Sequence, residues 1–548
     1  MPPPAPPAPN QIQVENARPG TVAWQRAGSS AIEGYASEVT VAPGEQLHVH
    51  VSTAARYRVE VFRLGWYGGA GARLVACSPA CDRDETAPAQ PRPSKPPSNP
   101  LGDVVRAWWW TSDTIAVGPD WTSGYYVAEF VLTTGPDAGR AASAPFVVRD
   151  SQSATASQIL VQVPVNTWQA YNQWGGKSLY DFGTTRAYRV SFDRPYGTFA
   201  QSPMWWEIQL VRFLEREGYD VSYQTDIDTD RDPGSLLRHQ LAMTAGHDEY
   251  WTLGMRNAFD AARDAGTNLA FMGSNTGYWV VQYQDDYKTI FSYKSTYDPN
   301  PDPSQKTSMF RELVPARPEC ELMGVQHRYL RPHQDGPVDY TVTDAAASDP
   351  WFANTGLQPG DVVRNVVGDE WDALNPWPAD QCEKPGLVVL FHYQAVQGSD
   401  DANADAVRYT APSGARVFAS GAQRFSWGLD DFGTRYMGGG EPPDPRLQQF
   451  VRNMLDDLTR PASPTELRLR YRGLRVRIWV PPSTDPRIAG IAAFRKTHGQ
   501  PPVPVCSGVS SCIDTLPGPG RYRYGVVYVN VWSRASAPLI SRPVFVSP

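Results

Sequence analysis

The chain has 548 residues, of which 41% are hydrophobic, 20% charged and 11% aromatic, and its net charge is −7 at neutral pH. This composition is typical of globular domains and excludes long disordered or fibrous architectures. A nucleic-acid binder normally concentrates positive charge, and we find no basic block. No apolar run approaches the roughly 18 residues of a membrane-spanning helix. We expect several globular domains with neither a nucleic-acid partner nor a membrane span.

The first predicted domain is rich in β-strands. A Pro- and Ala-rich run at residues 1–11 predicts a flexible N-terminus, without the charged and apolar regions of a signal peptide. In residues 12–150, short runs such as 38–52 and 124–134 alternate apolar and polar positions between turn residues. This pattern predicts a β-sandwich.

The second predicted domain, residues 151–462, has a different periodicity. Apolar runs at 157–165 and 241–245 indicate buried strands, whereas 205–218 and 253–266 have apolar residues at helical spacing. Strands that alternate with helices predict an α/β domain with a parallel sheet covered on both faces.

Residues 463–548 return to short β-type runs and predict a small immunoglobulin- or fibronectin-like sandwich. The arginines of RLRYRGLRVR in this region alternate with apolar residues, as on the solvated face of a strand. The predicted fold class is therefore a multidomain chain, with a central α/β domain between two β-sandwiches.

Six cysteines fall into three pairs along the chain: Cys77 with Cys81, Cys320 with Cys382, and Cys506 with Cys512. An even count with local pairing predicts disulfides in an exported protein. Zinc is a poor alternative because neither short pair has CxxC spacing or a second ligand pair nearby. We expect a secreted or cell-surface protein whose leader has been removed.

Candidate functional residues follow the predicted strands of the central domain. Ligands of open α/β sheets bind beyond the carboxyl ends of the strands, so polar and aromatic residues there predict a site. Possible substrate contacts among them are Trp168, Asn172, Trp174, Lys177, Asn275 and Trp279.

The strongest candidate for catalysis or metal binding is the run His247-Asp248-Glu249, which follows a predicted strand. An imidazole and a carboxylate in one turn can share a metal or divide acid and base roles. The alternative is structural: one carboxylate caps the next helix and His247 bonds to backbone.

The run 226–230 places three aspartates at alternate positions but lacks the later Gly and Glu of a calcium loop. We expect a capping or loop-ordering role there.

Six runs occur in order along the chain: FRLGWYGGAGAR (62–73), AYNQWGGKSLYDF (170–182), SFDRP (191–195), DIDTD (226–230), GHDEYW (246–251) and SWGLD (426–430). Taken together, they resemble the large-subunit-like proteins of N,N-dimethylformamidase over about residues 60–460. The resemblance implies a central domain like class I glutamine amidotransferases, without their nucleophilic cysteine. It also implies one iron held by two tyrosines and a glutamate, with a histidine beside the glutamate.

Carried over to this chain, the glutamate and histidine fall on Glu249 and His247, and the first tyrosine on Tyr171. The second tyrosine should lie near 191–195, where Phe192 occupies the aligned position and Tyr196 follows four residues later. Either Tyr196 substitutes, which gives Tyr171, Tyr196 and Glu249 as the implied ligands of Fe(III), or the metal site is incomplete and the family chemistry is lost. Asp193 and Tyr188 are further possible donors.

If iron is bound, the resemblance implies hydrolysis of a small amide. The metal would polarise the carbonyl or activate water, and His247 or Asp248 would move the proton to the leaving amine. Asn172 and Asn275 could hydrogen-bond to the oxyanion.

Two other functions stay open. A glycoside hydrolase would use paired carboxyls about 5–10 Å apart and no metal, for example Glu249 with Asp193 or Asp226. A non-catalytic carbohydrate-binding surface protein would keep the pocket only as a relic. We expect a hydrolase acting on a small amide or a carbohydrate.

Overall fold

The structure is a computed structural model of the chain. It describes residues 8–87, 89–91, 103–150, 156–181, 185–197, 203–330, 336–374, 382–395, 402–434 and 441–546. Residues 1–7 of the predicted Pro-rich N-terminus lie outside this part. Helix α1 (Gln11–Asn16) follows, and the Asn10 side chain caps it by accepting from the Gln13 backbone.

The N-terminal region forms the predicted β-sandwich. One sheet has the order β2-β9-β8-β4-β5 with β6 beside β4, and the other has the order β1-β3-β7. Both sheets contribute to one apolar core, for example Val49 from β3 and Val59 from β4. The strands are β1 (Ile32–Ala36), β2 (Thr40–Val41), β3 (Gln46–Thr53), β4 (Arg56–Leu64), β5 (Ala72–Ser78), β6 (Glu85–Thr86), β7 (Asp113–Ala116), β8 (Gly124–Leu132) and β9 (Ala141–Val148).

The central region is built on a nine-stranded sheet of order β12-β10-β13-β15-β25-β24-β23-β20-β21. The strands from β12 to β25 pair in parallel, and the remaining pairs are antiparallel. The strands are β10 (Ile159–Val163), β12 (Val221–Thr225), β13 (Leu241–Gly246), β15 (Asn268–Gly273), β20 (Val338–Val342), β21 (Val362–Val367), β23 (Val388–Tyr393), β24 (Ala404–Thr410) and β25 (Arg416–Ala419).

The predicted parallel sheet of the glutamine amidotransferase kind is therefore not supported, because the sheet is mixed and the chain as a whole is mostly β. The physical reason lies in the connections. Strand β20 pairs with β21, and β23 with β24, each with its neighbour in the chain. Antiparallel neighbours need no crossover helix, whereas parallel neighbours do.

Helices cover both faces of the parallel half of the sheet. Val161 of β10 packs with Val211 of α4 and Met454 of α9, whereas its neighbour Leu160 belongs to a second cluster with Phe259 of α6. Consecutive strand residues point to opposite faces. The helices are α2 (Val165–Tyr171), α3 (Pro203–Trp206), α4 (Ile208–Arg216), α5 (Asp226–Arg231), α6 (Leu253–Asp264), α7 (Cys320–Met323) and α9 (Pro445–Leu458).

Three small sheets lie beyond the strand ends of the central sheet. Their orders are β11-β18-β17, β14-β16 and β19-β22. Two of them, β14-β16 and β19-β22, carry or adjoin residues of the site described below. The strands are β11 (Arg189–Ser191), β14 (Tyr250–Trp251), β16 (Trp279–Val280), β17 (Gln282–Gln284), β18 (Thr289–Phe291), β19 (Gln326–Leu330) and β22 (Glu370–Ala373).

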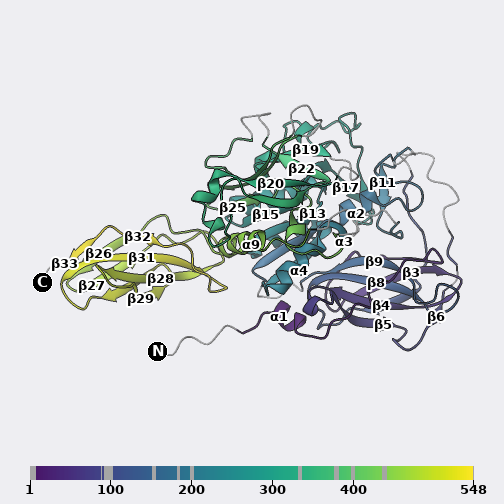
Figure 1. The fold of residues 1–548 in the computed structure, drawn as a ribbon, viewed down its shortest axis with the longest axis horizontal. Coiled ribbons are helices and arrows are strands. Elements are labelled where there is room, and N and C mark those ends of the chain that lie inside the picture. Colours follow the sequence, from purple (N-terminus) through teal and green to yellow (C-terminus); the bar gives the residue numbers. More distant parts are fainter. Residues whose placement is uncertain are drawn as a thin grey trace.

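The C-terminal region forms a second sandwich that projects away from the rest of the molecule (Figure 1). Its sheets have the orders β26-β27-β30 and β29-β28-β31-β32, with β33 beside β31, and they enclose residues such as Ile478 and Tyr524. The strands are β26 (Arg468–Arg472), β27 (Arg475–Trp479), β28 (Ile488–Thr497), β29 (Val503–Gly508), β30 (Ser511–Thr515), β31 (Gly520–Asn530), β32 (Leu539–Ile540) and β33 (Val544–Val546).

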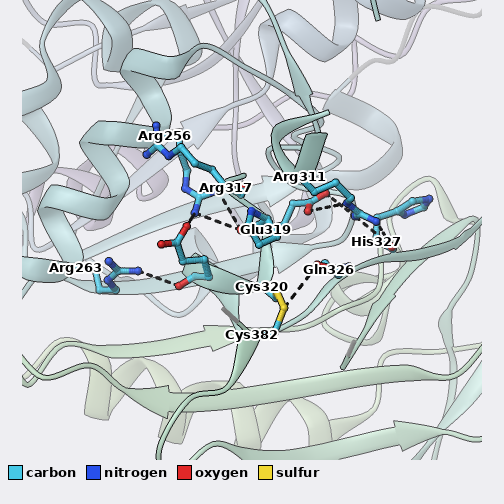
Figure 2. The surroundings of a disulfide bond; sticks show 11 residues. Arg256, Arg263, Arg311, Arg317, Glu319, Cys320, Gln326, His327 and Cys382 are labelled. Atoms are coloured by element: carbon cyan, nitrogen blue, oxygen red, sulfur yellow. Dashed lines mark hydrogen bonds and ion pairs between the residues drawn. A yellow bond between two sulfur atoms is a disulfide. The ribbon is translucent and has the colours of Figure 1, made fainter. Parts of the chain in front are cut away.

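All three predicted disulfides are confirmed, and no cysteine of the chain is free. Figure 2 shows the Cys320–Cys382 bond beside strand β19, where Cys382 Sγ lies 3.9 Å from Gln326 Oε1. Nearby, the Arg311 guanidinium donates to Glu319 at 2.7 Å and to the His327 carbonyl at 3.3 Å. These contacts fix the segment that carries His327.

The predicted domain limits at residues 150 and 462 stay predictions. Across the first limit the core is continuous, because Leu64 and Tyr125 of the sandwich belong to the same apolar cluster as Trp168 and Phe213 of the central region. Among the helices that the structure describes, none is long and apolar enough to cross a bilayer.

Candidate functional site

Two neighbouring parallel strands position the site. Tyr171 is the last residue of α2, which follows β10 almost directly, and His247 to Glu249 follow β13. The backbones come unusually close at the next strand end, since a Cβ on Gly273 would lie 1.7 Å from the Gly246 carbonyl oxygen. A side chain at Gly273 would therefore force these strand ends apart.

Three oxygen-bearing side chains converge at this edge. The Tyr180 hydroxyl lies 2.7 and 2.8 Å from the two carboxylate oxygens of Glu249, and the Tyr171 hydroxyl donates to Glu249 Oε2 at 3.0 Å. Glu249 is buried, whereas both tyrosines are half-buried. We call Tyr171, Tyr180 and Glu249 the oxygen cluster.

Burial raises the pKa of the Tyr171 and Tyr180 phenols well above 10, and the charge of Glu249 adds to the shift. Without a cation, both phenols therefore keep their protons and donate them to the carboxylate. A multivalent cation would reverse this balance, because it stabilises phenolate and carboxylate together.

His247 connects the oxygen cluster to a second carboxylate. Its Nε2 lies 3.4 Å from Glu249 Oε2 and 3.4 Å from Glu370 Oε2. Burial alone would lower the pKa of His247, but the carboxylates of Glu370 and Glu249 outweigh it and raise the pKa to about 9. Burial would likewise raise the pKa of Glu370, yet His247 lowers it to about 2. The two side chains form a buried imidazolium–carboxylate pair.

Asn275 holds Glu370 in place. Its side-chain amide donates to Glu370 Oε2, and its backbone N–H donates to Asp372 Oδ1 at 2.9 Å. Asn275 has a φ of 53°, in the left-handed region that asparagine tolerates better than most residues. His327 Nδ1 lies 3.9 Å from the same Glu370 oxygen.

A lysine and an indole line the other side of the oxygen cluster. Lys294 Nζ lies 3.5 Å from the ring centre of Tyr180 and 4.8 Å from that of Trp279, and it donates to the Tyr250 hydroxyl at 2.7 Å. Burial lowers the pKa of Lys294 to about 8. Trp279 lies on β16, beside Lys294, and is half-buried.

Of the sequence-predicted residues, the structure brings together Tyr171, His247 and Glu249. Two others lie next to this group: Asn275 donates to Glu370, and Trp279 lies near Lys294. It places the other predicted carboxylates elsewhere. Asp193 pairs with Arg106 and lies 3.9 Å from Lys288 Nζ. Asp248 accepts from the Gln162 amide at 2.7 Å and interacts with buried Asp226, and burial raises the pKa of both.

The aspartates of the run 226–230 order the chain locally, as expected. Thr225 caps helix α5, and Asp228 completes the capping box by accepting from the Thr225 backbone at 2.8 Å. Asp226 accepts from the Asn166 backbone at 2.8 Å. These contacts hold the ends of β10 and β12 in place.

The predicted substrate contacts before residue 180 are mostly structural. Trp168 is fully buried, and Trp174 packs edge-on against Trp109 and donates to Glu33 at 3.1 Å. Asn172 orders its loop by accepting from the backbones of Trp174 and Gly197. Lys177 is half-buried, and its carbonyl accepts from Arg194 at 3.0 Å.

Tyr196 does not occupy the position predicted for it. It is held near Gln169 and Arg194, and Tyr180 contacts Glu249 instead. The reason is local. Gly175 and Gly176, with φ of 82° and 86°, let the loop turn back so that the Tyr180 ring lies 4.3 Å from that of Tyr171. The two glycines, five and four residues before Tyr180, are the signal that the sequence offers for this turn.

Sequence reasoning also missed Glu370 and Lys294. Glu370 begins β22 and Lys294 follows β18, so neither comes from the carboxyl end of a predicted parallel strand. Glu370 is carried by the small sheet β19-β22 and Lys294 by the loop after β18, and no motif marks either residue.

Buried Glu207, close to the site, allows the effect of burial on a carboxyl pKa to be tested. Its Oε1 accepts from the Trp168 indole at 3.3 Å, and burial raises its pKa to about 8. The folded protein thus retains a proton that the unfolded chain releases above pH 4.5, so wild-type stability falls as pH rises towards 8. Relative to wild type, Glu207→Gln should gain about 2–4 kcal/mol between pH 5 and pH 8, measured by urea unfolding.

A suitable control for this experiment is Glu217→Gln, beyond the other end of α4. Arg452 hydrogen-bonds to Glu217 and lowers its pKa, so this variant should gain nothing over the same range. Parallel stability profiles for wild type and Glu207→Gln would contradict the argument.

Buried ionisable groups with strongly shifted pKa values, gathered at strand ends, are typical of active sites. The class is thus a multidomain, β-rich protein with an enzyme-like site. The chain belongs to the family described as N,N-dimethylformamidase beta subunit-like, C-terminal, whose model matches residues 58–439. This confirms the resemblance found in the sequence, and membership suggests a hydrolase at the level of the family.

No curated protein matches the chain. A solved Fn3-like protein from Clostridium thermocellum has 19% identity, covers 16% of this chain and 92% of its own, and has a TM-score of 0.13. The chitinase ChiA74 from Bacillus thuringiensis has 10% identity over 59% of this chain and 61% of its own, with a TM-score of 0.15. The FN1–FN3 domains of chicken CNTN1 have 8% identity over 39% and 55%, with a TM-score of 0.15. These scores are too low to support an argument.

Proposed function

We propose that the protein hydrolyses the carbon–nitrogen bond of a small amide with a metal, Fe(III), held by Tyr171, Tyr180 and Glu249. The observation that carries this proposal is the convergence of two phenol oxygens on one carboxylate, within 3.0 Å. Family membership supports the same reaction class.

The residues of the oxygen cluster fit such a metal. Phenolate and carboxylate are hard anionic ligands, the donor type that Fe(III) prefers. No three His, Cys, Asp or Glu side chains within the described ranges form a metal site, so the phenols are essential to this one. Both tyrosines are partly exposed, whereas Glu249 is buried. A bound Fe(III) would supply Lewis acidity to polarise the amide carbonyl or to lower the pKa of water.

The remaining side chains have assignable roles. His247 is within reach of Glu249 and is held as an acid by Glu370, so it would deliver the proton that the departing amine needs. Asn275 keeps Glu370 in place by its side-chain hydrogen bond. Lys294 would favour negative charge on the Tyr180 side of the cluster, since its Nζ lies over that ring.

The carbohydrate alternatives find less support. Asp193 and Asp226, the proposed partners of Glu249 in a glycosidase, are engaged by Arg106 and by Asp248. The three disulfides support export of the protein, which we also propose.

The test is metal analysis of two tyrosine variants. Purified wild type should contain about one iron per chain and a visible phenolate-to-iron absorption band. Tyr180→Phe should shift and weaken that band and lower the iron content, because one anionic ligand is lost. Tyr196→Phe, a matched substitution in the tyrosine predicted from sequence, should leave both unchanged.

Glu249→Ala completes the set and should remove iron entirely. Loss of the band in Tyr196→Phe but not in Tyr180→Phe would show that the ligand set is wrong. Wild-type protein that binds no iron when supplied with it would overturn the metal-dependent mechanism.

A further inference from the structure

The C-terminal domain differs from the rest of the chain in charge. Residues 463–548 contain twelve Lys and Arg against three Asp and Glu, whereas residues 1–462 contain 38 against 54. The prediction that the chain has no concentrated positive charge is therefore wrong for this domain. Such asymmetry between parts of one chain points to an anionic partner.

The charge is gathered on one sheet face. In sheet β26-β27-β30, Arg470 stands opposite Arg477 and Arg472 opposite Arg475. All four are exposed, while the intervening Val476 and Ile478 point into the core of the sandwich. Arg468 lies on the same face, with its guanidinium 4.7 Å from the ring centre of Trp479. We call these five arginines the arginine face.

Within the described residues, the four arginines of the two rows form no ion pair with a carboxylate. Like charges directly opposite each other destabilise a sheet, and here they occur in two successive rows. Asp514, on β30, points inward and pairs with Arg495 and Tyr524. In the part of the chain that the structure describes, the acidic partner at this face is Glu466, which pairs with Arg468 at its edge. Solvation of the strand face alone would not require arginines opposite arginines in two successive rows.

The neighbouring residues on the face are suited to an organic chain. Ile513, 45% exposed, lies opposite Arg477, and Trp479 lies opposite Arg468. Guanidinium groups bind carboxylates with two parallel hydrogen bonds, and an indole or an aliphatic side chain packs on the apolar face of a ring. Figure 1 shows the domain projecting from the molecule, so that a long polymer could reach this sheet.

We propose that the arginine face binds an acidic polysaccharide, with uronate carboxylates held by the arginine rows and sugar rings packed on Trp479 and Ile513. The arginines stand in successive rows along β26 and β27, so that repeated charges of a linear polymer could meet them. The disulfides favour an extracellular partner over nucleic acid. This inference is independent of the proposed amide hydrolysis.

The test is binding of the full chain to immobilised polygalacturonate, with dextran as the neutral polymer. Wild type should bind polygalacturonate at low salt and progressively less as salt rises. Arg470→Gln with Arg477→Gln should weaken binding about tenfold. Arg521→Gln with Arg523→Gln removes the same charge from exposed positions of β31, in the other sheet, and should change binding less than about twofold.

Arg472→Gln with Arg475→Gln tests the second row and should behave like the first pair, with circular dichroism confirming that each variant is folded. Equal losses in the Arg470/Arg477 and Arg521/Arg523 variants would overturn the proposal, because they would indicate non-specific charge. So would failure of wild type to bind polygalacturonate, or tighter binding to duplex DNA or to phosphatidylserine vesicles. Self-association at low salt that the Arg470/Arg477 variant abolishes would assign the face to a second copy of the chain.

Discussion

Replacing His247 by asparagine should lower kcat on small amides by about 10²- to 10⁴-fold while leaving the iron content unchanged. The imidazole is 1% exposed and lies 3.4 Å from both Glu249 and Glu370, but it is not part of the oxygen cluster. The substitution removes the proposed proton donor and keeps a polar side chain of similar size. Kinetics on an amide panel that includes N,N-dimethylformamide, together with iron analysis, would measure both quantities.

Two further variants show whether this loss comes from proton transfer. Glu370→Gln should lower kcat about tenfold or more with KM changed little, because Glu370 acts through His247. His239→Asn changes a buried histidine that contacts the Ser157 carbonyl at 2.7 Å, away from the site, and should leave turnover intact. If His247→Asn lost iron together with activity, His247 would serve the integrity of the cluster instead of moving protons.

The sequence predicted the parts of the fold that depend on local pattern. Alternation of apolar and polar residues indicated both sandwiches, and the cysteine spacing indicated all three disulfides. The mixed sheet could not be predicted in the same way. Strand β23 is an almost continuous apolar run, as buried parallel strands also are, and only long-range pairing makes its partners antiparallel.

The site residues, too, could be predicted only where they follow a predicted strand. Tyr171, His247 and Glu249 follow predicted strands, so the strand-end rule found them. Tyr180 and Glu370 reach the site through a glycine turn and through the small sheet β19-β22. Their positions depend on tertiary packing, and in the sequence only the glycine turn before Tyr180 hints at them. Conversely, Trp168 and Asn172 follow a strand and yet serve the core and the loop.

The buried pair Arg63–Glu215 should have the largest effect on stability. Arg63 of β4 and Glu215 of α4 are both fully buried and form two hydrogen bonds, of 2.9 and 2.8 Å, between the N-terminal sandwich and the central region. Arg63→Met would leave the Glu215 carboxylate buried without its cation. We expect a loss of about 3–5 kcal/mol in the free energy of unfolding, measured by urea denaturation followed by tryptophan fluorescence.

A double variant distinguishes the cost of leaving Glu215 uncompensated from the contribution of the ion pair to the free energy of unfolding. Arg63→Met combined with Glu215→Leu should recover most of the loss, since apolar residues can replace a buried ion pair at little cost. Arg149→Met breaks a partly exposed pair with Glu45 of similar length, 2.6 Å, and should cost less than about 1 kcal/mol. If Arg63→Met cost no more than Arg149→Met, the contact between sandwich and central region would owe its stability to the shared apolar core around Leu64 and Phe213, and not to this ion pair.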